Sequence, residues 1–284
     1  MILLEIKEKN MAVLPTHKEA LSNKQEEKID NYIKFQDEKE IKHLTIDYLN
    51  ELIAHYMLKV PFENINVQNK QEINLTLDGL YDKIISNHRG GYCYEMNTFF
   101  RHYLQKKDFV AFNTSATIVT PKGRSREGSH MTTIVEIDNN SYIADVGFGD
   151  LPMKAIPIGT HEHFETVMDI NGTFRAIQIN NQIFVQKLVD GEYKTKYEAS
   201  IHAQELQDFK DNIEYNQYNP ESIFVKQLLI TMPNPDGRKT MTHRQMTITD
   251  HGEKTTTPVN KDNYRKLLEE NFGLNIDIKR IDEQ

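Results

Sequence analysis

The spacing of apolar residues changes near Asp108, and this change divides the chain into two parts. Upstream, apolar residues recur every three or four positions, which is typical of one face of an amphipathic helix. Downstream, they alternate with polar residues, which indicates strands whose side chains point to opposite faces. We therefore expect a helical part followed by a β part.

Caps and breakers delimit the helices. Thr45 is placed to cap a helix that must end before Pro61, because the residue before a proline is pushed out of the helical region. Thr76 is placed to cap a second segment. The predicted apolar faces are Leu49, Leu52, Ile53, Tyr56 and Met57 for the first, and Leu77, Leu80, Tyr81, Ile84 and Ile85 for the second. The charged residues 23–28 suit a solvated helix or a flexible lead-in.

Strands are predicted over residues 112–119, 130–137 and 141–146, the last two joined by a hairpin turn within 138–140. Asn171-Gly172 and Asp190-Gly191 are dipeptides typical of tight turns. Several short antiparallel strands at this spacing favour a barrel or a strongly curled sheet.

The last third has a mixed pattern. We expect a polar helix over residues 203–213, a strand over 223–231, a turn at Pro235-Asp236-Gly237, a second strand over 240–249 and a final helix around Leu267, Leu268 and Phe272.

Composition limits the class of protein. The 284 residues allow one large domain or two to three small ones. The single cysteine excludes an internal disulfide framework or a cysteine-rich zinc site and suits a reducing cytosol. A net charge of −8 argues against a general nucleic-acid binder. No stretch approaches the roughly 20 apolar residues that cross a membrane, and residues 1–8 lack the apolar core of a signal peptide. We expect a cytoplasmic protein.

The only cysteine lies in Arg89-Gly90-Gly91-Tyr92-Cys93-Tyr94-Glu95-Met96-Asn97. Gly90-Gly91 allows a sharp turn into a helix that continues with Met96, Phe99, Phe100, Tyr103 and Leu104. Cys93 therefore falls at a helix start, where unpaired amides and the positive dipole end favour a thiolate nucleophile. A lone cysteine is more often a small buried hydrophobe, but a core position needs neither the glycine turn nor a helix start.

A cysteine nucleophile needs a base and an acceptor that orients the base. His130 begins a strand after a glycine-containing loop, and Asp145 is an acid in an otherwise apolar strand, where it needs a partner. Each residue alone also suits an ordinary role: an exposed or satisfied histidine, and a strand-end acid that accepts from the amides of Gly147 or Gly149. Together with Cys93 they favour catalysis.

The hairpin register decides whether His130 and Asp145 can meet. If Asp138 and Asn139 are the central turn residues, Asp145 faces Thr132 and lies diagonally from His130, about 7 Å away. If Asn139 and Asn140 are central, the two are about 13 Å apart along the strand, which is too far. The triad therefore requires the first register or an equivalent bulge.

Other motifs are weaker. His161-Glu162-His163 could hold a metal but lacks further spaced ligands, so we expect a loop and no metal site. Gly147-Phe148-Gly149 lacks phosphate-loop spacing, and Lys122, Arg124 and Arg126 are as easily solvated as phosphate-binding.

Five segments resemble the arylamine N-acetyltransferases. They are Val60-Pro61-Phe62-Glu63-Asn64, the Arg89–Asn97 stretch, His130 at a strand start, Asp145-Val146-Gly147-Phe148-Gly149 and, more loosely, Pro220-Glu221-Ser222-Ile223-Phe224. Their order and spacing agree over roughly residues 45–150, with a fainter similarity to about 225. Phe35-Gln36-Asp37 stands where the family usually has Ile-Gly.

The resemblance implies an α+β fold with a cysteine-proteinase-like thiol triad. Its expected parts are a helical bundle over residues 1–107 that carries the nucleophile, an antiparallel β-barrel over 108–214 that carries histidine and aspartate, and an α/β lid over 215–284. The family transfers an acetyl group from acetyl-CoA to an aromatic amine or hydrazine, in xenobiotic metabolism, by a ping-pong route through an acetyl-cysteine.

Residue by residue, the resemblance implies Cys93, His130 and Asp145 as the triad. It places Phe62, Ser129 and Phe148 at the acceptor, and Arg126, Gly147 and Gly149 along CoA. It implies a small-molecule acceptor, no metal, no nucleic acid or membrane partner, and a monomer or homodimer.

Three alternatives stay open. An amide synthase of the same fold would take its acyl chain from a carrier protein, a thiol hydrolase would use the same triad, and a binding protein would keep the fold without turnover.

Overall fold

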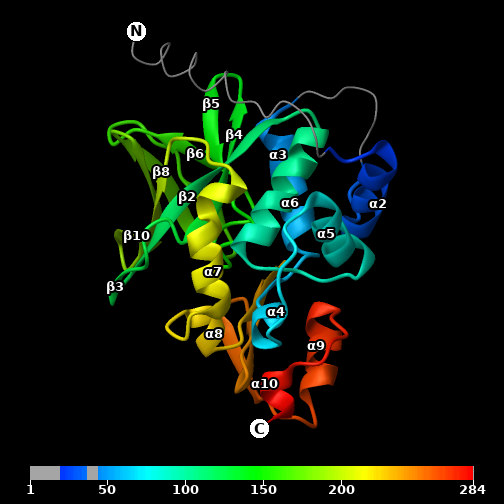
Figure 1. The fold of residues 1–284 in the computed structure, drawn as a ribbon. Coiled ribbons are helices and arrows are strands. Elements are labelled where there is room, and N and C mark those ends of the chain that lie inside the picture. The colour runs from blue at the N-terminus through cyan, green and yellow to red at the C-terminus, as the bar shows by residue number, and fades with distance from the viewer. Residues whose placement is uncertain (1–19, 37–43, 284) are drawn as a thin grey trace.

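The computed structural model describes residues 20–36 and 44–283, which form a helical layer, a β-barrel and a C-terminal sheet with its own helices (Figure 1). The prediction for residues 1–8 lies outside the described residues, as does part of the Phe35-Gln36-Asp37 segment. The expected α+β class is confirmed. The domain limits at 107/108 and 214/215 remain a prediction.

The helical layer begins with the predicted caps. The Thr45 hydroxyl accepts a hydrogen bond from the Tyr48 amide, and the Thr76 hydroxyl accepts from the Gly79 amide. The predicted apolar faces of both segments are buried. The elements of this layer are α2 (Asn23–Ile33), α3 (Ile46–Met57), α4 (Ile65–Gln68), α5 (Leu77–Tyr81), the π-helical turn η1 (Asp82–Ser86) and α6 (Cys93–Lys106).

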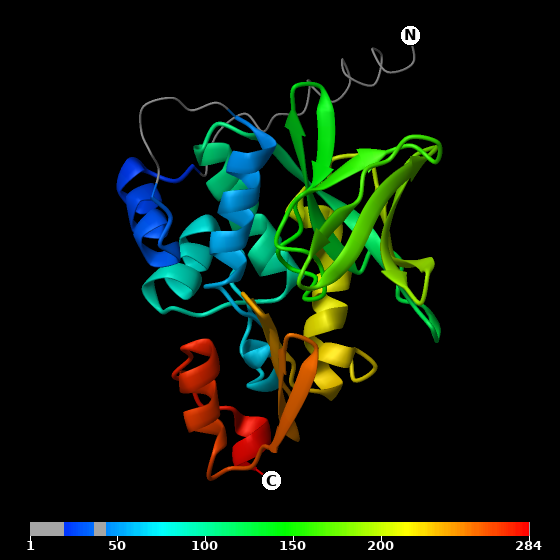
Figure 2. The same ribbon diagram turned by 180° about the vertical axis from the view of Figure 1, so that it is seen from behind.

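Helix α6 packs the helical layer against the barrel. It packs on strands β2 (Val110–Thr120) and β4 (His130–Ile137), as Figures 1 and 2 show from opposite sides. Its aromatic residues Phe99, Phe100 and Tyr103 are completely buried. This burial fixes the position of the first residue of α6, Cys93, against the barrel wall.

Seven strands close the barrel in the described part of the chain. Neighbours pair in the order β2, β4, β5, β6, β8, β9, β10 and back to β2, and all pairs are antiparallel except β6–β8. A short strand, β7 (Val167–Asp169), pairs outside the ring with β8, and β3 (Gly123–Arg124) pairs with β2. The remaining ring strands are β5 (Asn140–Ile143), β6 (Ile156–Gly159), β8 (Gly172–Ile179), β9 (Gln182–Val189) and β10 (Glu192–Ser200).

The β4–β5 hairpin has the register that the triad requires. Ile134 faces Ile143, and Asp138 and Asn139 form the turn with φ values of +48° and +66°. Two successive positive φ values fit a type I′ turn, which asparagine and aspartate tolerate. The first of the two predicted registers is therefore correct.

One turn lies a residue earlier than predicted. Asp169 pairs with Gly172, so the central residues are Ile170 and Asn171 rather than Asn171 and Gly172. The Asp169 carboxylate accepts from the Asn171 amide and starts the turn at Asp169. The predicted Asp190-Gly191 turn is correct.

The C-terminal part differs most from the prediction, because side-chain caps override the apolar pattern. The helix expected over 203–213 is the 3₁₀ turn η2 (Leu206–Phe209) followed by α7 (Lys210–Tyr218), since Asp208 accepts from the Glu205 amide and delays the start. The strand expected over 223–231 begins as helix α8 (Ile223–Lys226), which Ser222 caps, and only then becomes β11 (Ile230–Asn234).

The strand expected over 240–249 is also two strands, β12 (Gly237–Met241) and β13 (Gln245–Asp250). The Thr242 hydroxyl accepts from the amides of Arg244 and Gln245 and turns the chain between them. The sheet order is β1 (Phe62–Glu63), β11, β12, β13 and β14 (Glu253–Pro258), so β1 brings a segment of the helical layer into the C-terminal sheet.

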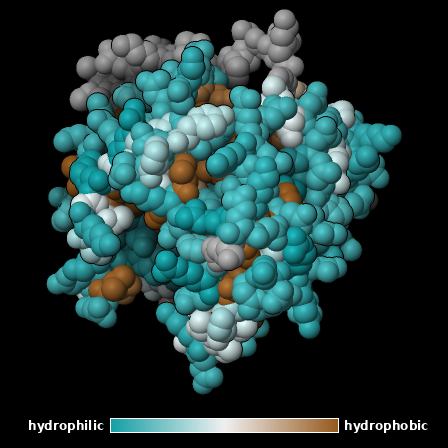
Figure 3. Space-filling model, turned by 60° about the horizontal axis from the view of Figure 1, so that its bottom comes forward, coloured by the Kyte–Doolittle hydropathy of each residue, from teal (hydrophilic) through white to brown (hydrophobic). Residues whose placement is uncertain are grey.

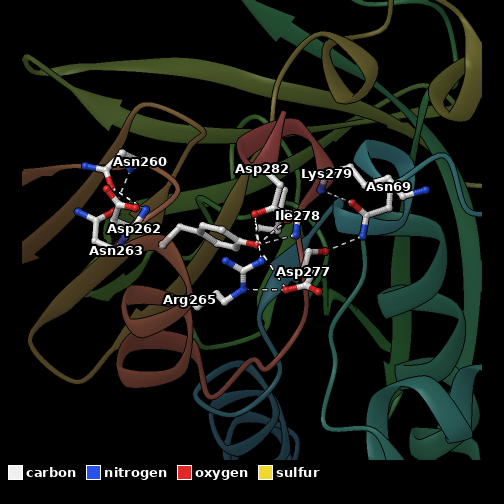
Figure 4. A network of polar contacts seen from close by, with 10 residues as sticks. Asn69, Asn260, Asp262, Asn263, Arg265, Asp277, Ile278, Lys279 and Asp282 are labelled. Carbon is white, nitrogen blue, oxygen red and sulfur yellow. Dashed lines mark hydrogen bonds and ion pairs between the residues drawn. The ribbon is translucent and has the colours of Figure 1, made fainter. Parts of the chain in front are cut away.

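The chain ends in helices α9 (Tyr264–Phe272), as predicted, and α10 (Lys279–Asp282). Figure 4 shows the polar network that holds them. Asn69, which follows α4, donates to the Asp277 carbonyl at 2.7 Å and accepts from the Lys279 amide at 2.9 Å. Arg265 of α9 bonds to Asp277 and Asp282. The C-terminal end is thus tied to the helical layer.

The face in Figure 3 is mostly hydrophilic, with apolar residues in small, separate patches. Within residues 20–36 and 44–283, no helix combines the length and apolar character needed to cross a bilayer.

Candidate active site

Cys93 is the first residue of α6, and its side chain is buried and unpaired with any other sulfur. The two preceding glycines are required by close packing. A Cβ on Gly90 would lie 1.7 Å from the Pro61 carbonyl oxygen, and one on Gly91 would lie 2.6 Å from the Glu95 carboxylate. The glycines therefore bring the backbone into the helix along a path that any side chain would block.

A buried group of charges lies beneath this turn. Glu63 binds Arg89 at 2.6 Å, and Lys83 binds Glu95 at 2.7 Å while approaching Glu63 at 3.8 Å. Burial raises the pKa of Glu63, but Arg89 and Lys83 outweigh it and the net pKa is lowered. Burial raises the pKa of Glu95 despite Lys83. Both carboxylates anchor the backbone: Glu63 accepts from the Ile65 amide and Glu95 from the Tyr92 amide.

His130 begins β4, and Asp145 follows β5 in the same hairpin. The ring Nε2 and the Asp145 carboxylate oxygen Oδ2 are 2.7 Å apart, and both side chains are buried. Burial disfavours charge on the ring, but the Asp145 charge, its hydrogen bond and the contact with Cys93 raise the pKa of His130 to about 10. Burial raises the pKa of Asp145, and His130 more than reverses this, so that the pKa is lowered.

Cys93 is the third member of the arrangement. The neighbouring Cys93 side chain is one cause of the raised pKa of His130, which places the thiol beside the ring. Because Nε2 is engaged by Asp145, the nitrogen left for the sulfur is Nδ1. The structure therefore brings together the three residues that the sequence singled out.

Two residues of the site were missed by the sequence analysis. Asn97, one helical turn after Cys93, donates to Asp145 Oδ1 at 2.9 Å and to the Met131 carbonyl at 2.7 Å. Tyr197 of β10 is buried against the His130 ring, and its hydroxyl lies near Asp145 and bonds to Thr132 at 3.1 Å. The i, i+4 spacing from Cys93 could have indicated Asn97, whereas nothing in the alternating strand pattern singles out Tyr197.

The Gly147-Phe148-Gly149 segment closes over the reaction centre. The backbone amide of Gly147 donates to Asp145 at 2.9 Å. A Cβ on Gly147 would lie 2.8 Å from both the Cys93 Cα and the side-chain nitrogen Nδ2 of Asn97. Gly149 has a φ of +91°, which favours glycine. Phe148 packs on His130 and Tyr197, with ring centroids 5.3 Å apart in each pair.

The other predicted binding residues lie around this centre. Phe62 is buried in β1 and contacts Phe224, which in turn packs on Tyr92 next to Cys93. Ser129 precedes His130, and its carbonyl accepts from the Tyr94 hydroxyl at 2.8 Å. Arg126 is exposed and is held by α7, where it donates to Asn212 at 2.6 Å.

Two further features lie apart from this centre. A cavity of about 510 Å³ opens between Ile73 and the η2–α7 segment, and none of the candidate site residues lines it. His161, Glu162 and His163 are exposed. Within the described part of the chain, no three histidine, cysteine, aspartate or glutamate side chains are grouped closely enough to hold a metal ion.

A buried cysteine that faces a histidine–aspartate pair across a helix–barrel interface is the arrangement of thiol enzymes that form acyl intermediates. The sequence model of the N-acetyltransferase family matches residues 45–281, and the chain therefore belongs to this family, which includes the arylamine N-acetyltransferases. The family prediction is confirmed.

Three known proteins illustrate the likeness. An arylamine N-acetyltransferase of Escherichia coli (strain K12) is 27% identical over 239 residues, which cover 82% of this chain and 84% of the relative. The crystal structure of an arylamine N-acetyltransferase from Bacillus cereus, described as having a unique Cys-His-Glu catalytic triad, superposes with a TM-score of 0.81 at 22% identity over 90% of this chain and 100% of that one. The Mycobacterium marinum arylamine N-acetyltransferase in complex with CoA gives a TM-score of 0.78 at 21% identity over 87% and 92%. At these identities the two structures establish the fold.

Proposed function

We propose that this protein is an acetyl-CoA-dependent arylamine and arylhydrazine N-acetyltransferase that works by a ping-pong mechanism through an acetyl thioester on Cys93. The observation that carries the proposal is the buried His130 ring, which is held between the Asp145 carboxylate and the Cys93 thiol. The family supplies the acceptor class, and the CoA complex of the Mycobacterium marinum relative supports acetyl-CoA as the donor.

The raised pKa of His130 favours a pair in which the imidazole is charged and the sulfur is a thiolate. The start of α6 adds to this, because helix N-termini stabilise negative charge. Asp145 fixes the ring orientation and stabilises its positive charge. Asn97 and the Gly147 amide hold Asp145 in place through its other oxygen.

In the first half-reaction, the Cys93 sulfur attacks the carbonyl carbon of acetyl-CoA. A bond forms to Cys93 and the bond to the CoA sulfur breaks. The imidazolium of His130 gives its proton to the departing CoA thiolate. Since one thioester replaces another, this step is close to balanced in free energy.

In the second half-reaction, the nitrogen of the aromatic amine attacks the same carbonyl carbon, and Cys93 leaves as a thiolate. An aromatic amine is largely uncharged at neutral pH, so its lone pair is free to attack. His130 takes the proton that the nitrogen loses, which restores the ion pair.

Binding roles follow from position. Phe148 packs on His130, and Phe62 packs on Phe224, which contacts Tyr92 next to Cys93; these rings provide aromatic walls that help to keep water from the thioester. We assign Ser129, Phe148 and Phe62 to the binding of the acceptor. We assign Gly147 and Gly149 to the CoA side of the site, where Arg126 offers an exposed positive charge for the phosphates.

The test is the intact mass of the protein after brief mixing with acetyl-CoA. We expect wild type to gain one acetyl group and an added aromatic amine to remove it, whereas Cys93→Ser gains none. Because Cys93 is the only cysteine, the site of labelling is unambiguous.

Other outcomes support the alternatives. Labelling that no amine or hydrazine removes would indicate a binding protein of this fold without turnover. No labelling of folded wild type would contradict acetyl-CoA as donor and favour a carrier-dependent amide synthase or a thiol hydrolase.

A further inference from the structure

Strand β10 contains a β-bulge beside the reaction centre. Thr195 faces Gln186 of β9 and Tyr197 faces Val185, so Lys196 is an extra residue without a partner of its own. A bulge of this kind re-aims side chains and is common near active sites. Here Lys196 and Tyr197 both approach the ring of Phe148. The ring centroids of Tyr197 and Phe148 are 5.3 Å apart, and the Lys196 ammonium lies 5.9 Å from the Phe148 centroid.

Phe148 also packs on His130, with ring centroids 5.3 Å apart. The Lys196 ammonium and the His130 imidazole therefore both lie against the same aromatic ring. In a regular strand, residues adjacent in sequence point to opposite faces. The bulge is thus the reason that a cation and the buried Tyr197 both border the site.

A second lysine joins Lys196. The ammonium groups of Lys187 and Lys196 donate to the two oxygens of Asp150 at 2.8 and 3.0 Å. Lys187 lies two residues after Val185, which is buried inside the barrel, so its side chain leaves the strand on the interior face. Burial raises the pKa of Asp150, but the hydrogen bonds and charges of the two lysines lower it, which keeps the carboxyl ionised at neutral pH.

The group formed by Lys187, Lys196 and Asp150 carries one excess positive charge. The Lys187 and Lys196 side chains are 21% and 28% exposed, so both can be reached from outside. Each ammonium has three N–H donors and uses one on Asp150 in these contacts. Arg238 of β12 adds a third cation whose charge interacts with Asp150. Its guanidinium donates to the neutral oxygens of Asn171 and Thr231.

We propose that Lys196, supported by Lys187, binds an anionic substituent on the acetyl acceptor, so that the enzyme prefers aromatic amines bearing a carboxylate to neutral ones of the same size. The inference rests on the proposed function, since it concerns the acceptor of that reaction. An amine that attacks the Cys93 thioester beside His130 has the Phe148 ring as its aromatic neighbour. A carboxylate on that amine can then reach the Lys196 ammonium, because the ammonium lies 5.9 Å from the centroid of the same ring.

The test compares two acceptors, 4-aminobenzoate and its neutral analogue 4-aminobenzamide. The measured quantity is the ratio of their kcat/KM values, which cancels general losses of activity. We expect wild type to favour the carboxylate, and Lys196→Gln to lower the ratio about tenfold, as loss of one close charge interaction would. Lys196→Arg should preserve the ratio. Asp150→Asn should raise it, because it frees both ammonium groups.

The matched control is Lys194→Gln. Lys194 lies two residues earlier in β10, is exposed and pairs with Glu192, so its removal should leave the ratio unchanged. An unchanged ratio in Lys196→Gln would overturn the proposal. A raised KM for acetyl-CoA in that variant, with the acceptor ratio unmoved, would assign the cations to the phosphates of CoA and overturn it equally.

A second measurement uses no acetyl transfer. Benzoate should protect Cys93 of wild type from alkylation by iodoacetamide at lower concentration than benzamide does, and Lys196→Gln should remove the difference. Equal protection by both compounds in wild type would contradict the proposal. If folded wild type gains no acetyl group from acetyl-CoA while benzoate still protects selectively, the proposed function fails and the anion site stands.

Discussion

At the scale of single residues, His130 is a buried ring whose raised pKa favours the charged form at neutral pH. Burial alone would lower its pKa, but Asp145 and Cys93 raise it from 6.5 to about 10. A group that binds its proton more tightly in the folded state stabilises that state. This stabilisation is complete below pH 6.5, the unfolded pKa, and is lost as the pH rises through the folded pKa near 10.

We therefore expect the stability gap between wild type and His130→Gln to depend on pH. The free energy of unfolding of wild type should exceed that of the variant by the largest amount at pH 6.5. This difference should then fall by about 1 kcal/mol per pH unit as the pH approaches 10. Urea unfolding at a series of pH values measures the gap.

The control for this experiment is His251→Gln, which removes a fully exposed histidine. Its gap to wild type should stay small throughout. A gap for His130→Gln that is constant over this pH range would show that the ring is not charged in the folded protein.

The grouping of Cys93, His130 and Asp145 could be predicted from the sequence because two of these residues break a local pattern. Cys93 is the only cysteine and comes shortly after two glycines, and Asp145 is an acid in an apolar run whose strand ends at Ile143. Tyr197 could not be predicted, because the bulge at Lys196 sets its direction and a bulge depends on the pairing of two strands rather than on either sequence. The same reason hides the cation beside Phe148.

At the scale of elements, the loop after β5 holds Asp145 and also touches Cys93. Gly147 has no space for a side chain, because a Cβ would lie 2.8 Å from the Cys93 Cα and from the side-chain nitrogen Nδ2 of Asn97. The loop and the start of α6 are thus in direct backbone contact.

Gly147→Ala should separate them. We expect acetylation of Cys93 by acetyl-CoA to slow about 100-fold, because a shift of about 1 Å is enough to misalign such a site, and stability to fall by about 1–3 kcal/mol. Quenched mass spectrometry measures the rate.

Gly191→Ala is the control. This change strains the turn between β9 and β10, where Gly191 has a φ of +80° and an added Cβ would have open space around it. It should lower stability while leaving the acetylation rate unchanged. A normal rate in Gly147→Ala would show that the loop accommodates a side chain and that the contact has no role in alignment.

Elements were predicted well where hydrophobic period and caps agree, as in α3 and in the β4–β5 hairpin. They were predicted poorly between residues 203 and 249. There, single side chains such as Ser222 and Thr242 bond to nearby amides and turn the chain within an apolar run. Such bonds compete with the pattern and leave little trace in the apolar spacing.

At the scale of the whole molecule, Asn64 joins distant segments. Its side chain is buried, donates to the carbonyls of Phe224 and Gln227 at 2.9 Å each, and accepts from the Leu229 amide at 2.8 Å. These bonds attach the segment after β1 to the α8–β11 connection, and Phe224 in turn packs on Tyr92.

Asn64→Ala should leave these three backbone groups without their partner. We expect a loss of about 2–4 kcal/mol in the free energy of unfolding, and faster hydrogen exchange in residues 224–229. Exchange in the β4–β5 hairpin should stay slow at the temperature where 224–229 opens. Uniform acceleration across the molecule would instead indicate that the C-terminal sheet and the barrel unfold as one unit.

The closed ring of seven strands has a geometric consequence. An odd number of strands cannot alternate in direction all the way around a ring, so at least one seam between like-directed neighbours is unavoidable. The seam lies between β6 and β8, three strands from β2 along either arc, and β2 is the wall on which α6 rests. The parallel seam demands the long crossover over residues 160–171. The Asp169 carboxylate in this crossover accepts a hydrogen bond from the Met153 amide, so the crossover is tied to the same β5–β6 connection that carries Asp145 and Phe148.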